Sequence, residues 1–176
     1  KNNIPLLIEK PIGVPYQPIE LWEELIKLNT SVPIYTGYIL RNDRCALLIK
    51  DLIARKEVGD IIDADFYCGS WLPKWRKGID YRKTVTANKS LGGGALLELS
   101  HEIDIALWLF DEIKLQSSII EQSNLLDINV EDYVLLSGRT KKKANITIRL
   151  NLCTRPNKRT VSIRGSLGEI IWDVNI

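Results

Sequence analysis

The sequence predicts an α+β fold: a largely antiparallel open sheet with helices on one face, preceded by a remnant of a parallel α/β unit. The second half of the chain alternates apolar and polar residues with a period of two, as strands with one buried face do. Residues 4–8 are instead continuously apolar, which is typical of a strand buried on both faces of a parallel sheet. Between these parts, a run of glycines opens a stretch with helical periodicity.

Composition excludes several classes of function. The 176 residues are 45% apolar and 26% charged, as in an ordinary globular protein. The net charge of +2 does not indicate a nucleic-acid-binding protein. No apolar run approaches the ~20 residues of a membrane span, so we expect neither a nucleic-acid nor a membrane partner. Cys45, Cys68 and Cys153 form no metal-ligand spacing with the single histidine, so we expect reduced thiols, no metal and a cytoplasmic protein.

The ends of the chain indicate a fragment. It begins at Lys1 and contains no methionine. The strand predicted at residues 4–8 needs parallel neighbours, and no strand precedes it. We therefore expect residues 1–31 to be the end of a parallel α/β domain and residues 32–176 to form an incomplete α+β domain.

Periodicity and capping signals place the first elements. The expected segments are a helix at 18–30, a strand at 32–40, a helix at 43–58, a strand at 60–70 and an irregular loop at 71–90. Asn42 or Asp43 caps the second helix, and Gly59 stands just past its end. The strand at 60–70 has one buried face, made by Ile62, Ala64, Phe66 and Cys68.

Strands fill the second half of the chain. They are predicted at residues 113–122, 130–138, 145–152, 159–164 and 169–174. The strand at 145–152 is the clearest, because Ile146, Ile148 and Leu150 alternate with polar residues. The connections are short and hairpin-like, so the sheet should be largely antiparallel with one polar face.

Residues 91–111 (LGGGALLELSHEIDIALWLFD) carry the most informative pattern. Placed on one helix at about 100° per residue, they gather an apolar stripe of Leu96, Leu99, Ile103, Ala106, Leu107 and Phe110. The opposite face carries His101 and is apolar too, through Leu97, Ile105 and Trp108. A helix that is apolar on both faces needs cover on both, so we expect the face of His101 to meet another domain.

His101, the only histidine, has a structural and a functional interpretation. A helix histidine near carboxylates is more often a satisfied structural side chain than a catalyst. Glu98 and Asp104, however, lie three residues to either side, within reach on a helix, and a carboxylate there fixes the imidazole tautomer. The glycines at 92–94 let a backbone or ligand approach the helix start, and ligand sites concentrate at interdomain faces. These features favour a catalytic His101.

Other candidate residues lie in the first predicted strand and in the loop at 71–90. Lys10 stands between Glu9 and Pro11 at the carboxyl end of that strand, the edge at which open α/β sheets bind ligands. In the loop, aromatic and guanidinium side chains indicate either a binding surface or a loop packed on its own domain. These side chains are Trp75, Arg76, Tyr81 and Arg82.

Taken in order, several motifs resemble the Gfo/Idh/MocA family of NAD(P)-dependent oxidoreductases: "IEKPIG", "YILRND", "LPKWRKGIDYR", "GGGALLELSHEIDIALWLF" and "RPNKRTVSIRGSLGEIIWD". The resemblance covers essentially the whole chain. It implies a Rossmann domain followed by an α+β domain whose open sheet often mediates oligomerisation. By this resemblance the chain starts near the last Rossmann strands and stops before the usual end, so it lacks the Gly-rich dinucleotide loop, and it contains no GxGxxG.

The resemblance also implies roles for single residues. Lys10, the lysine of the family's EKP motif, would bind near the nicotinamide of NAD or NADP and the substrate hydroxyl, with Glu9 and Pro11 beside the cofactor. His101 would be the acid/base that moves the hydroxyl proton while hydride passes to or from the nicotinamide. The "LSHEID" form is similar to that of members encoded with bacterial surface-sugar biosynthesis.

The chain departs from the family pattern just before the histidine. Many members carry an aspartate four residues before it, where this chain has Leu97, so Glu98 is the candidate substitute. Glu98 and Asp104 would orient His101 or bind substrate hydroxyls. Trp75, Arg76, Tyr81 and Arg82 would complete the substrate site.

These expectations describe the C-terminal substrate-binding portion of an NAD(P)-dependent sugar or nucleotide-sugar dehydrogenase or reductase, inactive by itself and forming a homo-oligomer through its open sheet. One alternative is a non-catalytic regulatory relative that binds dinucleotide or sugar as a signal. The presence of both Lys10 and His101 argues against it. The other alternative is a structural dimerisation module, in which the titratable residues form a core network.

Overall fold

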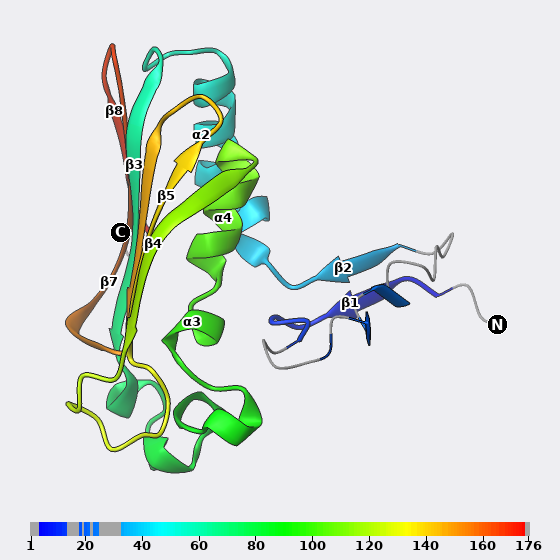
Figure 1. The fold of residues 1–176 in the computed structure, drawn as a ribbon, viewed down its shortest axis with the longest axis vertical. Coiled ribbons are helices and arrows are strands. Elements are labelled where there is room, and N and C mark those ends of the chain that lie inside the picture. The colour runs from blue at the N-terminus through cyan, green and yellow to red at the C-terminus, as the bar shows by residue number, and fades with distance from the viewer. Residues whose placement is uncertain (1–3, 14–17, 19, 22, 25–32, 175–176) are drawn as a thin grey trace. The chain divides into compact units, whose positions relative to one another are not determined.

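The computed structural model describes residues 4–13, 18, 20–21, 23–24 and 33–174 (Figure 1). The chain divides into two compact units, residues 1–38 and residues 39–176. Each unit is described by itself. The boundary predicted near Ser31 falls outside the described residues.

The described part of the first unit contains a parallel pair of strands. β1 (Leu6–Ile8) pairs with β2 (Ile34–Thr36), so the expected parallel strand is confirmed, but its partner follows it in the chain. Leu6 and Leu7 are 50% and 74% exposed, against the expected burial on both faces. The helix predicted at 18–30 lies largely outside the described residues.

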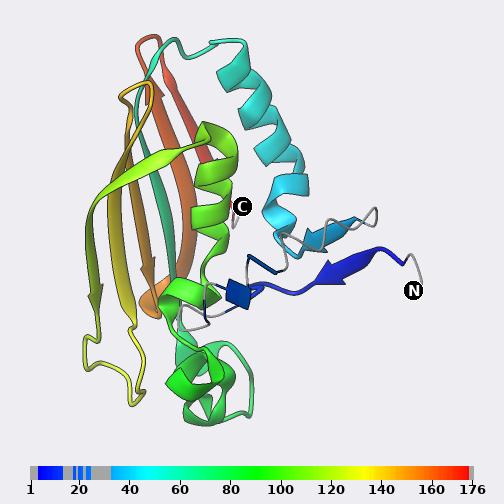
Figure 2. The ribbon, with the colours of Figure 1, turned by 45° about the vertical axis from the view of Figure 1, so that its right-hand side comes forward.

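The second unit is built on a six-stranded sheet with the order β4-β5-β6-β3-β7-β8. The strands are β3 (Ile61–Trp71), β4 (Ile113–Glu121), β5 (Tyr133–Thr140), β6 (Asn145–Asn151), β7 (Cys153–Gly165) and β8 (Glu169–Asp173). All neighbouring strands are antiparallel except β3 and β6, which are parallel. Figures 1 and 2 show the helices of this unit on one face of the sheet, so the predicted fold class is confirmed.

The helices of the second unit are α2 (Arg44–Ala54), α3 (Ala95–Glu98) and α4 (His101–Phe110). Short 3₁₀ turns accompany them: η1 (Ile39–Asn42), η2 (Leu72–Lys74), η3 (Tyr81–Lys83), η4 (Val85–Ala87) and η5 (Lys89–Leu91). Asp43 caps α2 by accepting a hydrogen bond from the amide of Cys45 at 2.8 Å. The helix ends at Ala54, before the predicted end at residue 58, and Lys56 then turns the chain with φ 56°.

The core lies between the helices and the sheet. Ala64, Phe66 and Cys68 of β3 are 1%, 1% and 6% exposed, as their alternation predicts. Ile62 was expected on the same face but is 54% exposed. The reason is local: the pairing of β3 with β7 is irregular between Ile61 and Asp63, and such an irregularity turns a side chain to the other face.

The stretch at 91–111 is not the single helix that periodicity predicts. α3 ends at Glu98, the backbone of Leu99 leaves helical geometry (φ −101°, ψ 25°), and α4 starts at His101. A helical wheel drawn across this break assigns the wrong phase to α4.

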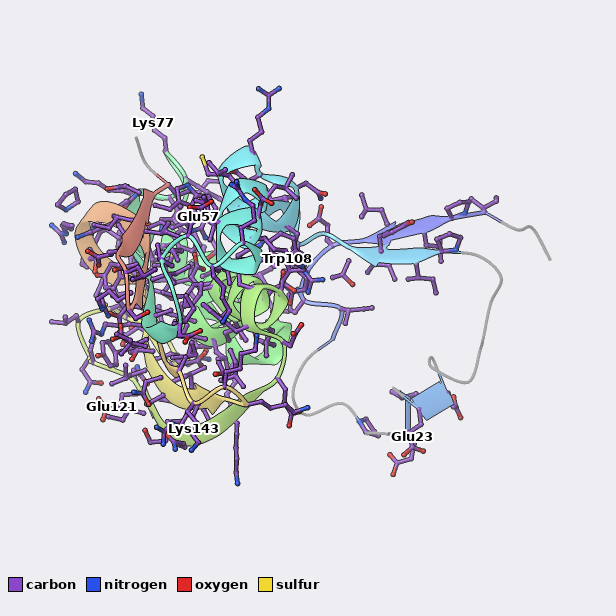
Figure 3. The ribbon with its side chains drawn as sticks, turned by 90° about the horizontal axis from the view of Figure 1, so that it is seen from above. Glu23, Glu57, Lys77, Trp108, Glu121 and Lys143 are labelled. Carbon is purple, nitrogen blue, oxygen red and sulfur yellow. The ribbon has the colours of Figure 1, made fainter. Side chains whose placement is uncertain are left out.

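The faces of α4 accordingly differ from the prediction. Its buried stripe contains Glu102, Ile105, Ala106 and Leu109. Leu107, expected in the core, is 44% exposed, and Ile105, expected on the opposite face, is 0% exposed. Trp108 is half-buried beside α2 (Figure 3), and the ammonium of Lys50 lies 3.9 Å from the centre of its ring.

Candidate functional site

The glycine run at 92–94 brings a carboxylate of the same chain to the start of α3. Gly94 has φ +111°, and a Cβ at this position would clash with the carboxylate of Glu131. Oε1 of Glu131 accepts a hydrogen bond from the amide of Leu96 at 3.0 Å, and its carbonyl oxygen accepts one from the amide of Ala95 at 3.0 Å. The close approach expected at the glycines is therefore made by Glu131, a residue that sequence reasoning missed.

The first turn of α4 gathers charged and titratable side chains. His101 is the first residue of the helix and is half-buried. Glu102 and Asp104 are 1% and 8% exposed. Nε of Arg159, on β7, lies 2.6 Å from Oε1 of Glu102. Arg41, in η1, donates to both carboxylate oxygens of Asp104, at 2.5 and 2.8 Å.

Sequence reasoning missed Glu102, Arg41 and Arg159. Glu102 carried a usable signal, because it stands one helical turn before two apolar residues of the buried stripe, and a carboxylate in such a stripe needs a cation. The identity of the cation could not be read locally. Arg159 lies 57 residues from Glu102, and Arg41 lies 63 residues from Asp104.

The Glu102–Arg159 pair also acts on a neighbouring thiol. Burial, and after it the Glu102 carboxylate, raise the pKa of Cys68 to about 11, against an opposing effect of Arg159. For Arg159 itself, burial lowers the pKa and Glu102 raises it, and the rise prevails. Cys68 is therefore an un-ionised thiol near neutral pH, whereas Arg159 keeps its charge.

A pocket of about 360 Å³ lies beside this ion pair, with Arg159, Trp75 and Leu99 among its walls. Nε1 of Trp75 donates a hydrogen bond to Oγ of Ser70 at 2.6 Å, which fixes the indole in place. Leu99 stands two residues before His101. A flat aromatic wall, an arginine and this volume suit a small polar ligand.

A larger pocket, of about 590 Å³, lies at the other end of α4, at Leu109 and Phe110. It is lined by the turns after α2 and α4 and by the β5–β6 turn. His101 is at the opposite end of the ten-residue helix. Its separation from the histidine excludes this pocket from the candidate site.

The loop at 71–90 packs on its own unit and also reaches the smaller pocket. Trp75 and Tyr81 pack against the core. The hydroxyl of Tyr81 accepts a hydrogen bond from the amide of Asp127 at 3.2 Å. Arg82 donates two hydrogen bonds to Asp80, each at 2.9 Å, and this carboxylate raises the pKa of the arginine. Of the four predicted residues, Trp75 lines the pocket beside Arg159, and Arg76 is exposed.

The two carboxylates predicted to orient His101 are placed differently. Asp104 shares the first turn of α4 with His101 but binds Arg41. Glu98 is the last residue of α3 and is half-buried. Because the helix breaks between Glu98 and His101, the spacing of three residues on one helix no longer relates them.

In the first unit, Glu9 and Lys10 directly follow the carboxyl end of β1. Gly37 follows the end of β2, and its amide donates to the carbonyl oxygen of Ile8 at 2.8 Å. A Cβ on Gly37 would lie 3.1 Å from a carboxylate oxygen of Glu9, so the glycine gives Glu9 room at this edge. Lys10 and Pro11 are half-buried.

Within the described ranges, no group of three or more His, Cys, Asp and Glu side chains is arranged to hold a metal ion. The helices seen in those ranges are too short or too polar to cross a bilayer.

Comparisons with known proteins agree with the fold and the order of motifs. Residues 46–171 match the family described as the GFO/IDH/MocA C-terminal domain. A sequence search of curated proteins gave no match.

Solved structures share the fold at low identity. GenD2 from gentamicin A biosynthesis, in complex with NAD, is 18% identical over 97% of this chain and 48% of that chain, with a TM-score of 0.79. The WlbA dehydrogenase from Bordetella pertussis, in complex with NADH and UDP-GlcNAcA, is 19% identical over 96% and 48%, with a TM-score of 0.77. Levoglucosan dehydrogenase, in complex with NADH and levoglucosan, is 18% identical over 97% and 48%, with a TM-score of 0.82. This chain spans about half the length of each.

Proposed function

The chain belongs to the GFO/IDH/MocA family, and from this premise we propose that it is the substrate-binding half of an NAD(P)-dependent dehydrogenase or reductase. Its substrate is a hydroxyl or carbonyl group of a sugar or nucleotide sugar. The observation that carries the proposal is the first turn of α4, where the only histidine is half-buried beside arginine-bound carboxylates. Structures of the same fold are complexes with NADH and either levoglucosan or UDP-GlcNAcA, which supports this substrate class.

His101 is the acid/base of the proposed reaction. NAD(P) supplies hydride chemistry when bound, and the protein must hold the substrate and move one proton. An imidazole exchanges a proton near neutral pH. Glu102 and Asp104 are each engaged by an arginine, so we assign the proton of the substrate hydroxyl to His101.

The described residues fit one end of the dinucleotide. The carboxyl edge of the β1–β2 pair is where open α/β sheets bind ligands, and Glu9, Lys10 and Pro11 follow β1 at that edge. We assign Lys10 to hydrogen bonding with the substrate hydroxyl near the nicotinamide, with Glu9 and Pro11 shaping the turn. The sequence holds no GxGxxG, so the loop that binds the pyrophosphate is assigned to a preceding segment.

The pocket of about 360 Å³ is the proposed substrate site. Trp75 offers a flat face to the apolar side of a sugar ring, and Arg159 offers directed donors to its oxygens. Glu98 and Asp104 remain candidates for orienting His101 or for binding substrate hydroxyls. Arg76, Tyr81 and Arg82 are assigned to the outer part of the substrate site.

We further propose that the active protein is a cytoplasmic homo-oligomer. The helices cover only one face of the six-stranded sheet (Figure 2). Within the described part of the second unit no helix covers the other face, and we propose that a second copy of the sheet covers it.

The test uses the full-length enzyme that contains this chain. We expect His101→Ala to lower kcat with a nucleotide-sugar or sugar substrate by about 10²–10⁴-fold, while the affinity for the dinucleotide stays unchanged. Lys142→Ala, at the distant pocket, is the control and should keep full turnover. Unchanged turnover of His101→Ala would remove the acid/base role. Joint loss of turnover and dinucleotide affinity would assign His101 a structural role.

A second measurement tests whether this chain binds the dinucleotide by itself. Calorimetric titration of the 176-residue chain with NAD or NADP should give no binding heat, because the pyrophosphate-binding loop is not part of its sequence. A clear binding signal would contradict the assignment of that loop to a preceding segment.

A further inference from the structure

Two arginines hold the first turn of α4 from different elements. Arg159 binds Glu102 from β7, and Arg41 binds Asp104 from η1, the turn that opens the second unit. Nε and Nη2 of Arg41 donate to the two oxygens of Asp104, at 2.8 and 2.5 Å. A bidentate pair of this kind fixes orientation as well as distance, because the planar guanidinium matches the carboxylate.

The later turns of α4 are held by apolar packing. Ile105, Ala106 and Leu109 pack into the core. Ser100, at the N-cap position, has a helical backbone, and its side chain makes no capping hydrogen bond. Because this end lacks a side-chain cap, the two ion pairs contribute to holding the turn that carries His101.

We propose that Arg41 is a positioning residue for the reaction assigned to His101. Through Asp104 it holds the first turn of α4 and sets the charge that the imidazole meets, an inference that rests on the proposed function. Asp104 lies three residues after His101, the spacing at which helical side chains are neighbours. With Arg41 bound, the Asp104 carboxylate is neutralised and does not draw the imidazole to its charged form. A neutral imidazole accepts the substrate proton.

Other charges also surround this turn within the described part of the second unit. On the helix side of the sheet they include Glu98 and Glu131 at α3, Glu102 on α4, Lys50 on α2 and Arg159 on β7. Asp63, Asp65 and Arg149 alternate with buried residues of β3 and β6 and therefore stand on the opposite face. Since Glu102 and Arg159 neutralise each other, changing Arg41 or Asp104 alters the net charge beside His101 by one unit.

The test is an NMR titration of the 176-residue chain, in which the only histidine gives one set of imidazole signals. Arg41→Gln leaves the Asp104 carboxylate uncompensated, so the titration midpoint of His101 should rise. Asp104→Asn leaves the Arg41 charge uncompensated, so the midpoint should fall. A pair too far from the imidazole to set its charge would produce no such reversal of sign.

Arg55→Gln is the matched control. It removes an ion pair of similar length, 2.8 Å to Asp51, between side chains that are 54% and 57% exposed. The midpoint of His101 should not change in this variant. Midpoints that stay fixed in Arg41→Gln and Asp104→Asn, or that move in the same direction, would overturn the role given to Arg41.

A kinetic measurement on the full enzyme separates position from charge. Arg41→Lys keeps the charge and loses the bidentate fork, so we expect a midpoint near the wild-type value and a kcat lowered about tenfold. The KM for the dinucleotide should stay unchanged. Wild-type kcat in this variant would overturn positioning by Arg41. Failure of the proposed function would show itself separately, as unchanged turnover in His101→Ala.

Discussion

Removing the buried carboxylate of Glu102 should destabilise the sheet unit strongly. Glu102 is 2% exposed at its side chain, Arg159 is 25% exposed, and 2.6 Å separate their charged atoms. Removing one member of a buried ion pair costs about 3–5 kcal/mol, because the other charge stays buried without compensation. Water can reach a quarter of Arg159, so we expect Glu102→Ala to lower the free energy of unfolding by about 3 kcal/mol, the lower end of that range.

Urea unfolding at pH 7, followed by tryptophan fluorescence, measures this loss. Four of the five tryptophans, Trp71, Trp75, Trp108 and Trp172, lie in residues 39–176, so most of the signal reports on the unit that contains the pair. Asp51→Asn, which removes an exposed ion pair with Arg55, should cost less than about 1 kcal/mol.

A double variant identifies the cause of the loss. Glu102→Leu combined with Arg159→Met replaces both charges by apolar groups of similar size, and should stay within about 1 kcal/mol of the wild type. A loss below about 1 kcal/mol in Glu102→Ala, or a double variant as unstable as the single one, would refute the reasoning that an orphaned buried charge dominates.

The remaining predictions concern a glycine and a thiol. Gly94→Ala should lower the urea midpoint much more than Gly78→Ala, because both glycines have positive φ but only Gly94 would clash with Glu131; equal losses would show that the clash is relieved. A thiol reagent at pH 8 should modify exposed Cys45 and leave Cys68 unmodified, since the pKa of Cys68 is raised to about 11. Because the pKa of the buried Cys68 thiol is raised from 9.0 to about 11, this thiol contributes fully to stability below pH 9. The contribution, about 2–3 kcal/mol, is lost as the pH rises towards 11. Cys68→Ala should therefore lose less stability over this pH range.

Elements whose signal lies in their own residues could be predicted. Ile146, Ile148 and Leu150 of β6 are 1%, 5% and 0% exposed, because a strand with one buried face displays its environment directly in its alternation. The start of α2 could be predicted for a similar reason. Its cap, Asp43, acts on an amide only two residues away.

For elements that depend on distant contacts, the predicted bounds were wrong. β7 begins at Cys153 rather than at residue 159, because its first residue pairs with Trp71 at the end of β3. Cys153 therefore adopts strand geometry because it pairs with another strand, not because of its neighbours in the sequence. The predicted helix at 91–111 fails for the same reason, since Glu131 holds the start of α3 from 35 residues away.

The residues of the candidate site also divide into those with a local sequence signal and those that depend on long-range contacts. His101, Asp104 and Trp75 could be named from the sequence because each belongs to a residue type with distinctive chemistry in a patterned stretch. Arg41 and Arg159 could not be named, because an arginine near a turn or in a strand is usually solvated and only the fold shows which carboxylate it meets. The structure thus adds the cations of the site to its predicted acid/base group.

Besides the break at Leu99, the Glu102–Arg159 pair contributes to the difference between the predicted and the observed phase of α4. A helical wheel counts Glu102 as polar and turns it towards solvent, which leaves His101 on the face opposite the core. The Arg159 guanidinium makes burial of Glu102 favourable, so the helix rotates until Glu102 joins Ile105 and Leu109 on the buried stripe. His101, about 100° away from Glu102 on the helix, then stands at the margin of that stripe and is half-buried. A long-range ion pair, and not only the local apolar pattern, therefore contributes to where the His101 imidazole lies.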